Sequence, residues 1–269
     1  MKRFLYAILA AASMLAVTSC DFLADWLDSL LDDGEDEVEY VDNWANLVNE
    51  TAYNAVVDGP TLTYGSHSYT IVTELDPETT EFSRATASVT FTNIPSGYTE
   101  FAAVYNGLLG KSLAGTAAMI PMAMEIFARD ADTGKKCIDL LCTSGAAGEF
   151  VTELRRKIVP SKYSGESDSY IQRYIPAALL KGATPAKAYA PDNNPYTVEM
   201  TMTSNGVKHN NQENGDVTYM CIVTSGGWSS AQRGVDIFQA SGSTMYKVFS
   251  CPSCYTQCQQ IQGTWAGLK

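Results

Sequence analysis

The apolar residues of this chain change their spacing twice, and the change restricts the fold class. Residues 61–93 and 196–250 alternate between apolar and polar positions with the period of two that β-strands require. Residues 98–182 instead carry apolar side chains at helical spacing. Because strands and helices segregated along a chain are typical of α+β proteins, we expect a central helical region flanked by two sets of antiparallel strands.

Turn signals between the periodic segments set the expected elements. The N-terminal set has three expected strands and the C-terminal set has four, and short polar links favour antiparallel pairing: 61–64, 67–74, 85–91, then 196–202, 217–224, 234–240 and 245–250. A first helix is expected over 41–57, and about five more form the central region: 98–109, 114–129, 134–143, 147–158 and 167–181. Pro121 and Pro176 fall inside two of these helices, where each must kink the helix or mark its true start.

The first twenty residues predict export and lipidation. Lys2 and Arg3 precede a short apolar run that ends at Val17-Thr18-Ser19-Cys20. A basic start, an apolar stretch and small residues before a cysteine form a lipoprotein signal peptide, and the stretch is too short to remain as a membrane span. We therefore expect residues 1–19 to be removed and Cys20 to attach the protein to a lipid bilayer through acyl chains. The alternative is an ordinary signal peptide in which Cys20 falls by chance.

Residues 20–42 are predicted to be a lipidated, acidic tether that begins with a short amphipathic helix, and residues 43–269 a single α+β domain. The segment 21–42 holds ten acidic residues and no basic one. Without Lys2 and Arg3, the mature chain has 18 − 2 = 16 basic and 30 acidic residues, so its net charge is 16 − 30 = −14. Since −10 of this charge belongs to the tether, phosphates and anionic head groups are repelled there, and nucleic-acid binding is disfavoured.

Six cysteines remain after lipidation, and an exported protein favours disulfides between them, with 15 possible pairings: Cys137, Cys142, Cys221, Cys251, Cys254 and Cys258. The last three are closely spaced and could instead hold a metal ion with a fourth ligand such as His209. A thioredoxin-like redox site is disfavoured, because only fifteen residues follow Cys254.

Aromatic residues in two predicted loops are the candidate ligand-binding residues. Trp228 lies in Gly226-Gly227-Trp228-Ser229-Ser230, and Tyr189 and Tyr196 flank a Pro- and Asn-rich turn. An aromatic ring in a loop can stack on a sugar or on another protein, so the expected partner is a glycan or an envelope protein. The alternative is that Trp228 folds back onto the sheet.

Signals for catalysis or a cofactor are weaker. The two histidines, His67 and His209, fall in turn or hairpin contexts, and no Gly-x-Ser-x-Gly motif is present. Residues 107–112 end like a phosphate-binding loop but lack its first glycine and a preceding strand, so no cofactor is expected. The leading prediction is a non-catalytic binding or interaction protein of the cell envelope, with no catalytic residue assigned. The alternative is a cell-envelope hydrolase of glycans or peptides with a dispersed active site.

Three long stretches of the chain resemble an uncharacterised domain family found in lipoproteins of gut Bacteroidetes and some Firmicutes. They are residues 115–125 (GTAAMIPMAME), 170–185 and 246–268. The resemblance covers roughly residues 60–269 and implies no activity and no site residue. It implies the outer membrane as the location, where acidic residues close to the lipidated cysteine can direct such lipoproteins to the cell surface. Asp21 fits that placement, but the dense acidic run starts only at Asp32, so the periplasmic face and the cell surface stay equally open.

Overall fold

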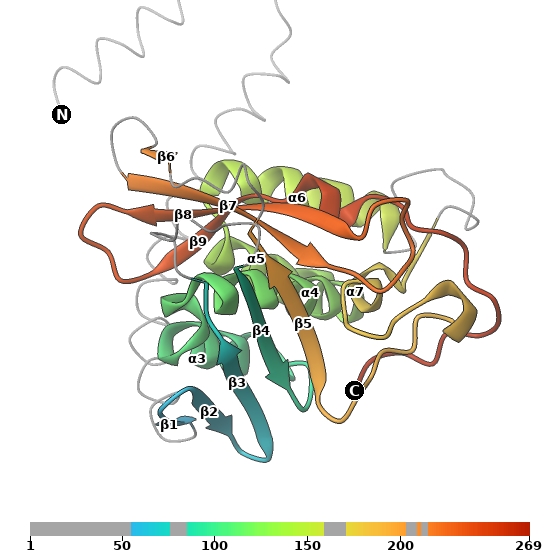
Figure 1. Ribbon diagram of the computed structural model, residues 1–269, viewed down its shortest axis with the longest axis horizontal. Helices are drawn as coiled ribbons and strands as arrows, with labels where there is room; N and C mark the ends of the chain where they lie inside the picture. Colours follow the sequence, from blue (N-terminus) through green and yellow to red (C-terminus); the bar gives the residue numbers. More distant parts are fainter. Residues whose placement is uncertain (1–54, 76–84, 159–170, 203–208, 211–214) are drawn as a thin grey trace, which may run out of the picture. The chain divides into compact units, whose positions relative to one another are not determined.

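Four strands, a block of helices and five further strands follow one another along the chain (Figure 1). The computed structural model describes residues 55–75, 85–158, 171–202, 209–210 and 215–269, all within the unit Thr51–Lys269. The strands are β1 (Ala55–Asp58), β2 (Thr61–Tyr64), β3 (His67–Thr73), β4 (Thr86–Phe91), β5 (Tyr196–Thr201), β6 (His209–Asn210), β7 (Gly215–Val223), β8 (Gln232–Ala240) and β9 (Tyr246–Ser250). The helices are α3 (Tyr98–Gly107), α4 (Leu113–Arg129), α5 (Ala131–Leu141), α6 (Ser144–Lys157) and α7 (Ile175–Ala178). This order confirms the α+β class.

The strands form one antiparallel sheet, not two separate sets. Its order is β1-β2-β3-β4-β5-β7-β8-β9, and β6 pairs with β7 outside this path. β4 pairs with β5 from Phe91–Tyr196 to Thr86–Thr201, which joins the strands before the helices to those after them. The predicted division into a three-stranded and a four-stranded region is therefore too simple, since a pairing between distant segments leaves no mark on the local period.

Helix α4 is the centre of the molecule. It is buried from Leu113 to Phe127 and contacts β3, β4, β8 and β9 as well as helices α5, α6 and α7. Figure 1 shows α3, α4 and α5 together on one side of strands β3 to β5. Any polar side chain that α4 carries in this region must therefore find its partners inside the protein.

Two of the predicted helices are corrected. The helix expected over 41–57 does not include its last residues, because Ala55–Asp58 form β1 and pair with β2; residues 41–54 lie outside the described residues. The helix expected over 167–181 is helical only at Ile175–Ala178 among its described residues. Pro176 stands in the first turn of this short helix, a position that the missing N–H of proline tolerates.

The last eight residues, Gln262–Lys269, cross the surface as an extended segment that we call the C-terminal strap. Backbone and side-chain hydrogen bonds hold it at both ends: Gln262 N to Pro185 O (2.9 Å), Ile94 N to Lys269 O (2.9 Å), and Lys269 N to the Tyr196 hydroxyl (2.9 Å). Most of its residues are exposed, while Trp265 and Leu268 are half-buried and pack against the core. Few side chains of the strap therefore anchor it to the rest of the molecule.

Candidate functional site

Two acidic side chains are buried in the described ranges, Glu100 and Glu125, each only 2 % exposed. A carboxylate inside a protein is unfavourable unless ion pairs and hydrogen bonds compensate for its lost hydration. Buried carboxylates are therefore candidates for functional groups. The two carboxylates differ in how many of their oxygens have hydrogen-bond partners.

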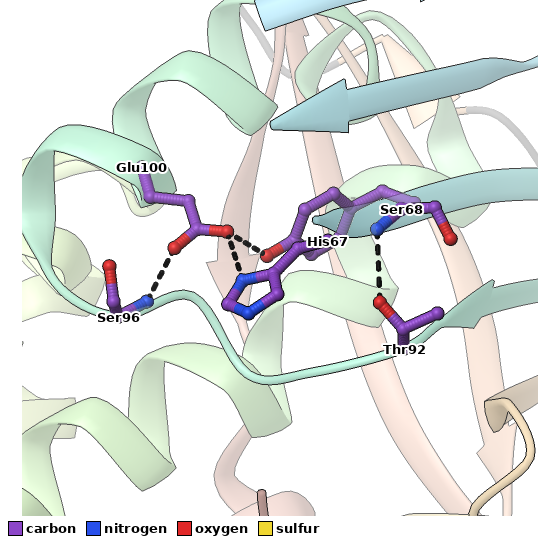
Figure 2. Close-up of polar contacts among 6 residues, drawn as sticks. His67, Ser68, Thr92, Ser96 and Glu100 are labelled. Atoms are coloured by element: carbon purple, nitrogen blue, oxygen red, sulfur yellow. Dashed lines mark hydrogen bonds and ion pairs between the residues drawn. The ribbon is translucent and has the colours of Figure 1, made fainter. Parts of the chain in front are cut away.

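Glu100 has a full set of partners. It lies in the first turn of α3 and accepts hydrogen bonds from Ser96 N (2.7 Å) and the Tyr69 hydroxyl (2.7 Å), and it is 2.7 Å from Nδ1 of His67. Figure 2 shows its carboxylate between His67 and Ser96, so the residue joins the start of α3 to strand β3. Burial acts to raise the pKa of Glu100, but the hydrogen bonds from Ser96, Tyr69 and His67 outweigh it and hold the pKa below the ordinary value.

The Glu100 carboxylate also orients an imidazole. The His67 side chain is 25 % exposed, and its Nδ1 faces the carboxylate. A carboxylate at one ring nitrogen fixes the orientation of a histidine and leaves the other nitrogen for a proton or a ligand. No local pattern in the sequence predicts this pair, because its two residues lie 33 positions apart.

Glu125 is only partly satisfied. It lies on α4, where its Oε1 accepts a hydrogen bond from Arg129 Nε at 2.9 Å. Its Oε2 is buried and has no hydrogen-bond partner in the part of the chain that the structure describes. Burial raises the pKa of Glu125, and the nearby Arg129 and Arg173 offset only part of this effect.

Two buried donors also lack partners. Nη1 of Arg173 and Nε1 of Trp265, a residue of the C-terminal strap, are buried without a hydrogen-bond partner among the described residues. The Arg173 guanidinium lies over the Trp265 ring, 5.6 Å from its centroid, and it interacts electrostatically with Glu125. We call these three residues the Glu125–Arg173–Trp265 cluster.

The cluster combines one unused acceptor with two unused donors. Most buried polar atoms in native proteins are hydrogen-bonded, so an unpaired set calls for a specific cause such as a ligand or an ordered water. Glu125 Oε2, Arg173 Nη1 and Trp265 Nε1 are the unpaired buried side-chain atoms of the described residues. This concentration makes the cluster the strongest candidate for a binding site.

The aromatic residues predicted to bind a ligand lie in a different environment. The rings of Tyr189 and Tyr196 are 0 % and 2 % exposed, and Tyr189 stacks on Tyr174 with 5.0 Å between ring centroids. Their rings therefore offer no open surface for stacking, because each tyrosine belongs to the core. Trp228 is half-buried, with Nε1 donating to Gln257 O at 3.0 Å and Arg233 over its ring.

The six cysteines of the domain are buried and have free thiols. Cys251 and Cys254 lie close enough for a thiol hydrogen bond, which together with burial raises the pKa of Cys251. The backbone of Cys258 pairs with the side-chain amide of Gln172: its carbonyl accepts from Nε2 at 2.7 Å and its N–H donates to Oε1 at 2.8 Å. In the described ranges, no group of three or more His, Cys, Asp or Glu residues could hold a metal ion, so the metal alternative receives no support. The structure contains no disulfide between these cysteines, and disulfide formation among them stays a prediction from the sequence.

Cys20 and the acidic segment 21–42 lie outside the described residues. Within the described part, no helix is long and apolar enough to cross a bilayer. The expected lipid attachment therefore stays a prediction from the sequence.

Comparison with known proteins identifies one similarity. A family model described as a domain of unknown function matches residues 93–262. No curated protein and no solved structure matches the chain. The matched region includes Glu125 and Arg173, whereas Trp265 lies three residues beyond its end.

Proposed function

The chain belongs to the family described as a domain of unknown function (DUF6935), and we propose that it is an exported, lipid-anchored binding protein. The ligand is a small polar molecule that binds at the Glu125–Arg173–Trp265 cluster. The anchor is Cys20, which attaches the protein to the outer membrane. The role is capture of the ligand rather than its chemical conversion.

One observation carries the binding proposal: the three unpaired buried atoms come from three distant parts of the chain. Glu125 belongs to the central helix, Arg173 to the segment before α7, and Trp265 to the C-terminal strap. Leaving each polar group unpaired costs about 1–3 kcal/mol, and more for a charged group. A ligand that pairs them recovers this free energy on binding, which gives affinity without a large contact area.

A thermal-shift screen tests the binding proposal. The full mature protein and an Arg173→Gln variant are screened against neutral sugars, amino acids, short peptides and dicarboxylates. We expect at least one compound to raise the melting temperature of the wild type and not that of the variant, because ligand binding stabilises only the state that binds. An Arg155→Gln variant on the exposed face of α6 is the control and should respond like the wild type. A screen in which no compound stabilises the wild type would contradict the proposal.

Palmitate labelling tests the anchor. In cells that produce the full chain, labelled palmitate should enter the wild type and a Cys137→Ala control. A Cys20→Ala variant should take up no labelled palmitate and should leave the membrane fraction, because it lacks the acyl chains that attach the wild type to the membrane. Label in the Cys20→Ala variant would refute lipidation at this residue.

A cell-envelope hydrolase is the second candidate, and the His67–Glu100 pair is the observation that favours it. A histidine oriented by a carboxylate can act as a general base if a nucleophile or water lies within reach of its free nitrogen. His67 meets the first requirement, because its Nδ1 lies 2.7 Å from the Glu100 carboxylate. Among the described residues, the unpaired buried side-chain atoms belong to the Glu125–Arg173–Trp265 cluster, which is therefore preferred as the functional site.

A further inference from the structure

The unpaired atoms of the cluster match the hydrogen-bonding pattern of one hydroxyl group. Glu125 Oε2 is an acceptor, while Arg173 Nη1 and Trp265 Nε1 are donors. A hydroxyl oxygen carries one O–H and two lone pairs, so a single hydroxyl can donate to the carboxylate and accept from both nitrogens. The cluster therefore suits a group that is donor and acceptor at once.

Charged groups match the same atoms poorly. An anion would accept from Arg173 and Trp265 but would place a second negative charge beside the Glu125 carboxylate. An ammonium group would pair with Glu125 but would face the Arg173 guanidinium and could accept from neither donor. The arrangement thus favours an uncharged ligand.

Arg129 links the carboxylate to the strap. Its Nε holds Oε1 of Glu125 at 2.9 Å, which leaves Oε2 for another partner. Its Nη2 donates to Leu268 O at 2.9 Å, so the same guanidinium fastens the strap beside the cluster. Opening of the strap and exposure of Glu125 are therefore connected through one side chain.

Two glycines in the strap adopt positive φ angles. Gly263 and Gly267 flank Trp265 and have φ angles of +111° and +86°, in the left-handed region that favours glycine. An added Cβ at Gly267 would meet no atom within 4 Å, so its conformation and not its packing requires glycine. Glycines of this kind on either side of a covering residue are suited to lift it and return it.

We propose that the Glu125–Arg173–Trp265 cluster binds a neutral sugar, one hydroxyl of which pairs with all three residues, and that the C-terminal strap opens to admit it. This inference rests on the proposed binding function and names its ligand class. Trp265 supplies the hydrogen-bond donor Nε1 and belongs to the segment that must move. Gly263 and Gly267 supply the motion.

Isothermal titration of the full mature protein tests the proposal. The probes are glucose, galactose and mannose, with acetate and methylammonium as charged comparisons. We expect a neutral hexose to bind the wild type, and Trp265→Phe to weaken this binding about tenfold, because the ring is kept and one donor is lost. Trp228→Phe is the matched control, since its indole donates to Gln257 O outside the cluster, and it should bind like the wild type.

A second pair of variants tests the strap. Gly267→Ala should weaken hexose binding, because alanine disfavours the closed backbone of the strap. Gly242→Ala carries the same kind of substitution at φ +77° in the turn between β8 and β9, also without a neighbour within 4 Å, and should leave affinity unchanged.

Each other outcome has a distinct meaning. Binding of acetate or methylammonium without any hexose would overturn the sugar assignment and leave the binding function standing. Hexose binding that survives Trp265→Phe would place the site elsewhere and overturn the proposal. If no probe binds, the sugar assignment is wrong and the proposal fails. The broader thermal-shift screen then decides separately whether another small molecule is bound.

Discussion

Gly134→Ala is expected to destabilise the protein more than a glycine-to-alanine substitution at any other described helical glycine. Gly134 lies on α5, where an added Cβ would overlap the backbone of Phe127 on α4. Asp130 ends α4 and caps α5, with its side chain accepting from Thr133 N at 2.7 Å, so the two helices cannot move apart easily. Backbone overlap cannot be relieved by a change of rotamer, and we expect a loss of about 3 kcal/mol or more in the free energy of unfolding.

Urea unfolding followed by circular dichroism measures this effect against a matched control. Gly148 is exposed on α6, and a Cβ there would meet no atom within 4 Å. Gly148→Ala should therefore stabilise the protein by roughly 0.5–1 kcal/mol, because glycine is a poorer helix former than alanine. An unchanged urea midpoint for Gly134→Ala would show that α4 and α5 do not pack as closely as the structure describes.

Local patterns in the sequence were enough to predict most of the elements. Helices α4 and α6 begin and end within three residues of their expected limits, since apolar periodicity and capping are properties of neighbouring residues. The junction of β4 and β5 could not be predicted, because it pairs Phe91 with Tyr196 across the whole helical region. The predicted numbers of strands before and after the helices were too low for the same reason. Short edge strands such as β1 form because they pair with a neighbouring strand, and their few residues show no clear alternation of apolar and polar side chains.

The candidate site was less predictable than the fold. Its three residues come from the central helix, the segment before α7 and the strap, so no spacing in the sequence connects them. One signal was available: Glu125 interrupts the apolar run Met122-Ala123-Met124-Glu125-Ile126-Phe127, and a carboxylate inside a buried helix needs internal partners. The aromatic residues of the predicted loops were the candidates from the sequence. Tyr189 is nevertheless buried, and its hydroxyl donates a hydrogen bond to Gln259 O at 2.8 Å. Turn residues predict a loop but not what lies over it.

Glu100→Ala is expected to cost about 3 kcal/mol of the free energy of unfolding. The substitution removes the acceptor of the Tyr69 hydroxyl and of Ser96 N, and a buried donor that is left unpaired costs its full desolvation free energy. The control is Glu149→Ala on α6, an exposed carboxylate that accepts from the Tyr255 hydroxyl at 2.9 Å, for which we expect a loss below about 1 kcal/mol. Urea unfolding at neutral pH compares the two.

The pH dependence of stability provides an independent measurement of the same carboxylate. The pKa of Glu100 is lowered in the folded protein, so its contribution to stability is present above the unfolded-state pKa and is lost as the pH falls through the folded value. The pKa of Glu125 is raised, so its contribution has the opposite sign: it is present below the unfolded-state pKa and is lost as the pH rises through the folded value. Glu100→Gln should therefore reduce the loss of unfolding free energy on acidification. Glu125→Gln should make this loss steeper, because the stability that protonation of Glu125 adds at low pH is then missing. Parallel acid profiles for the wild type and Glu100→Gln would mean that Glu100 does not hold its charge through hydrogen bonds from Tyr69, His67 and Ser96.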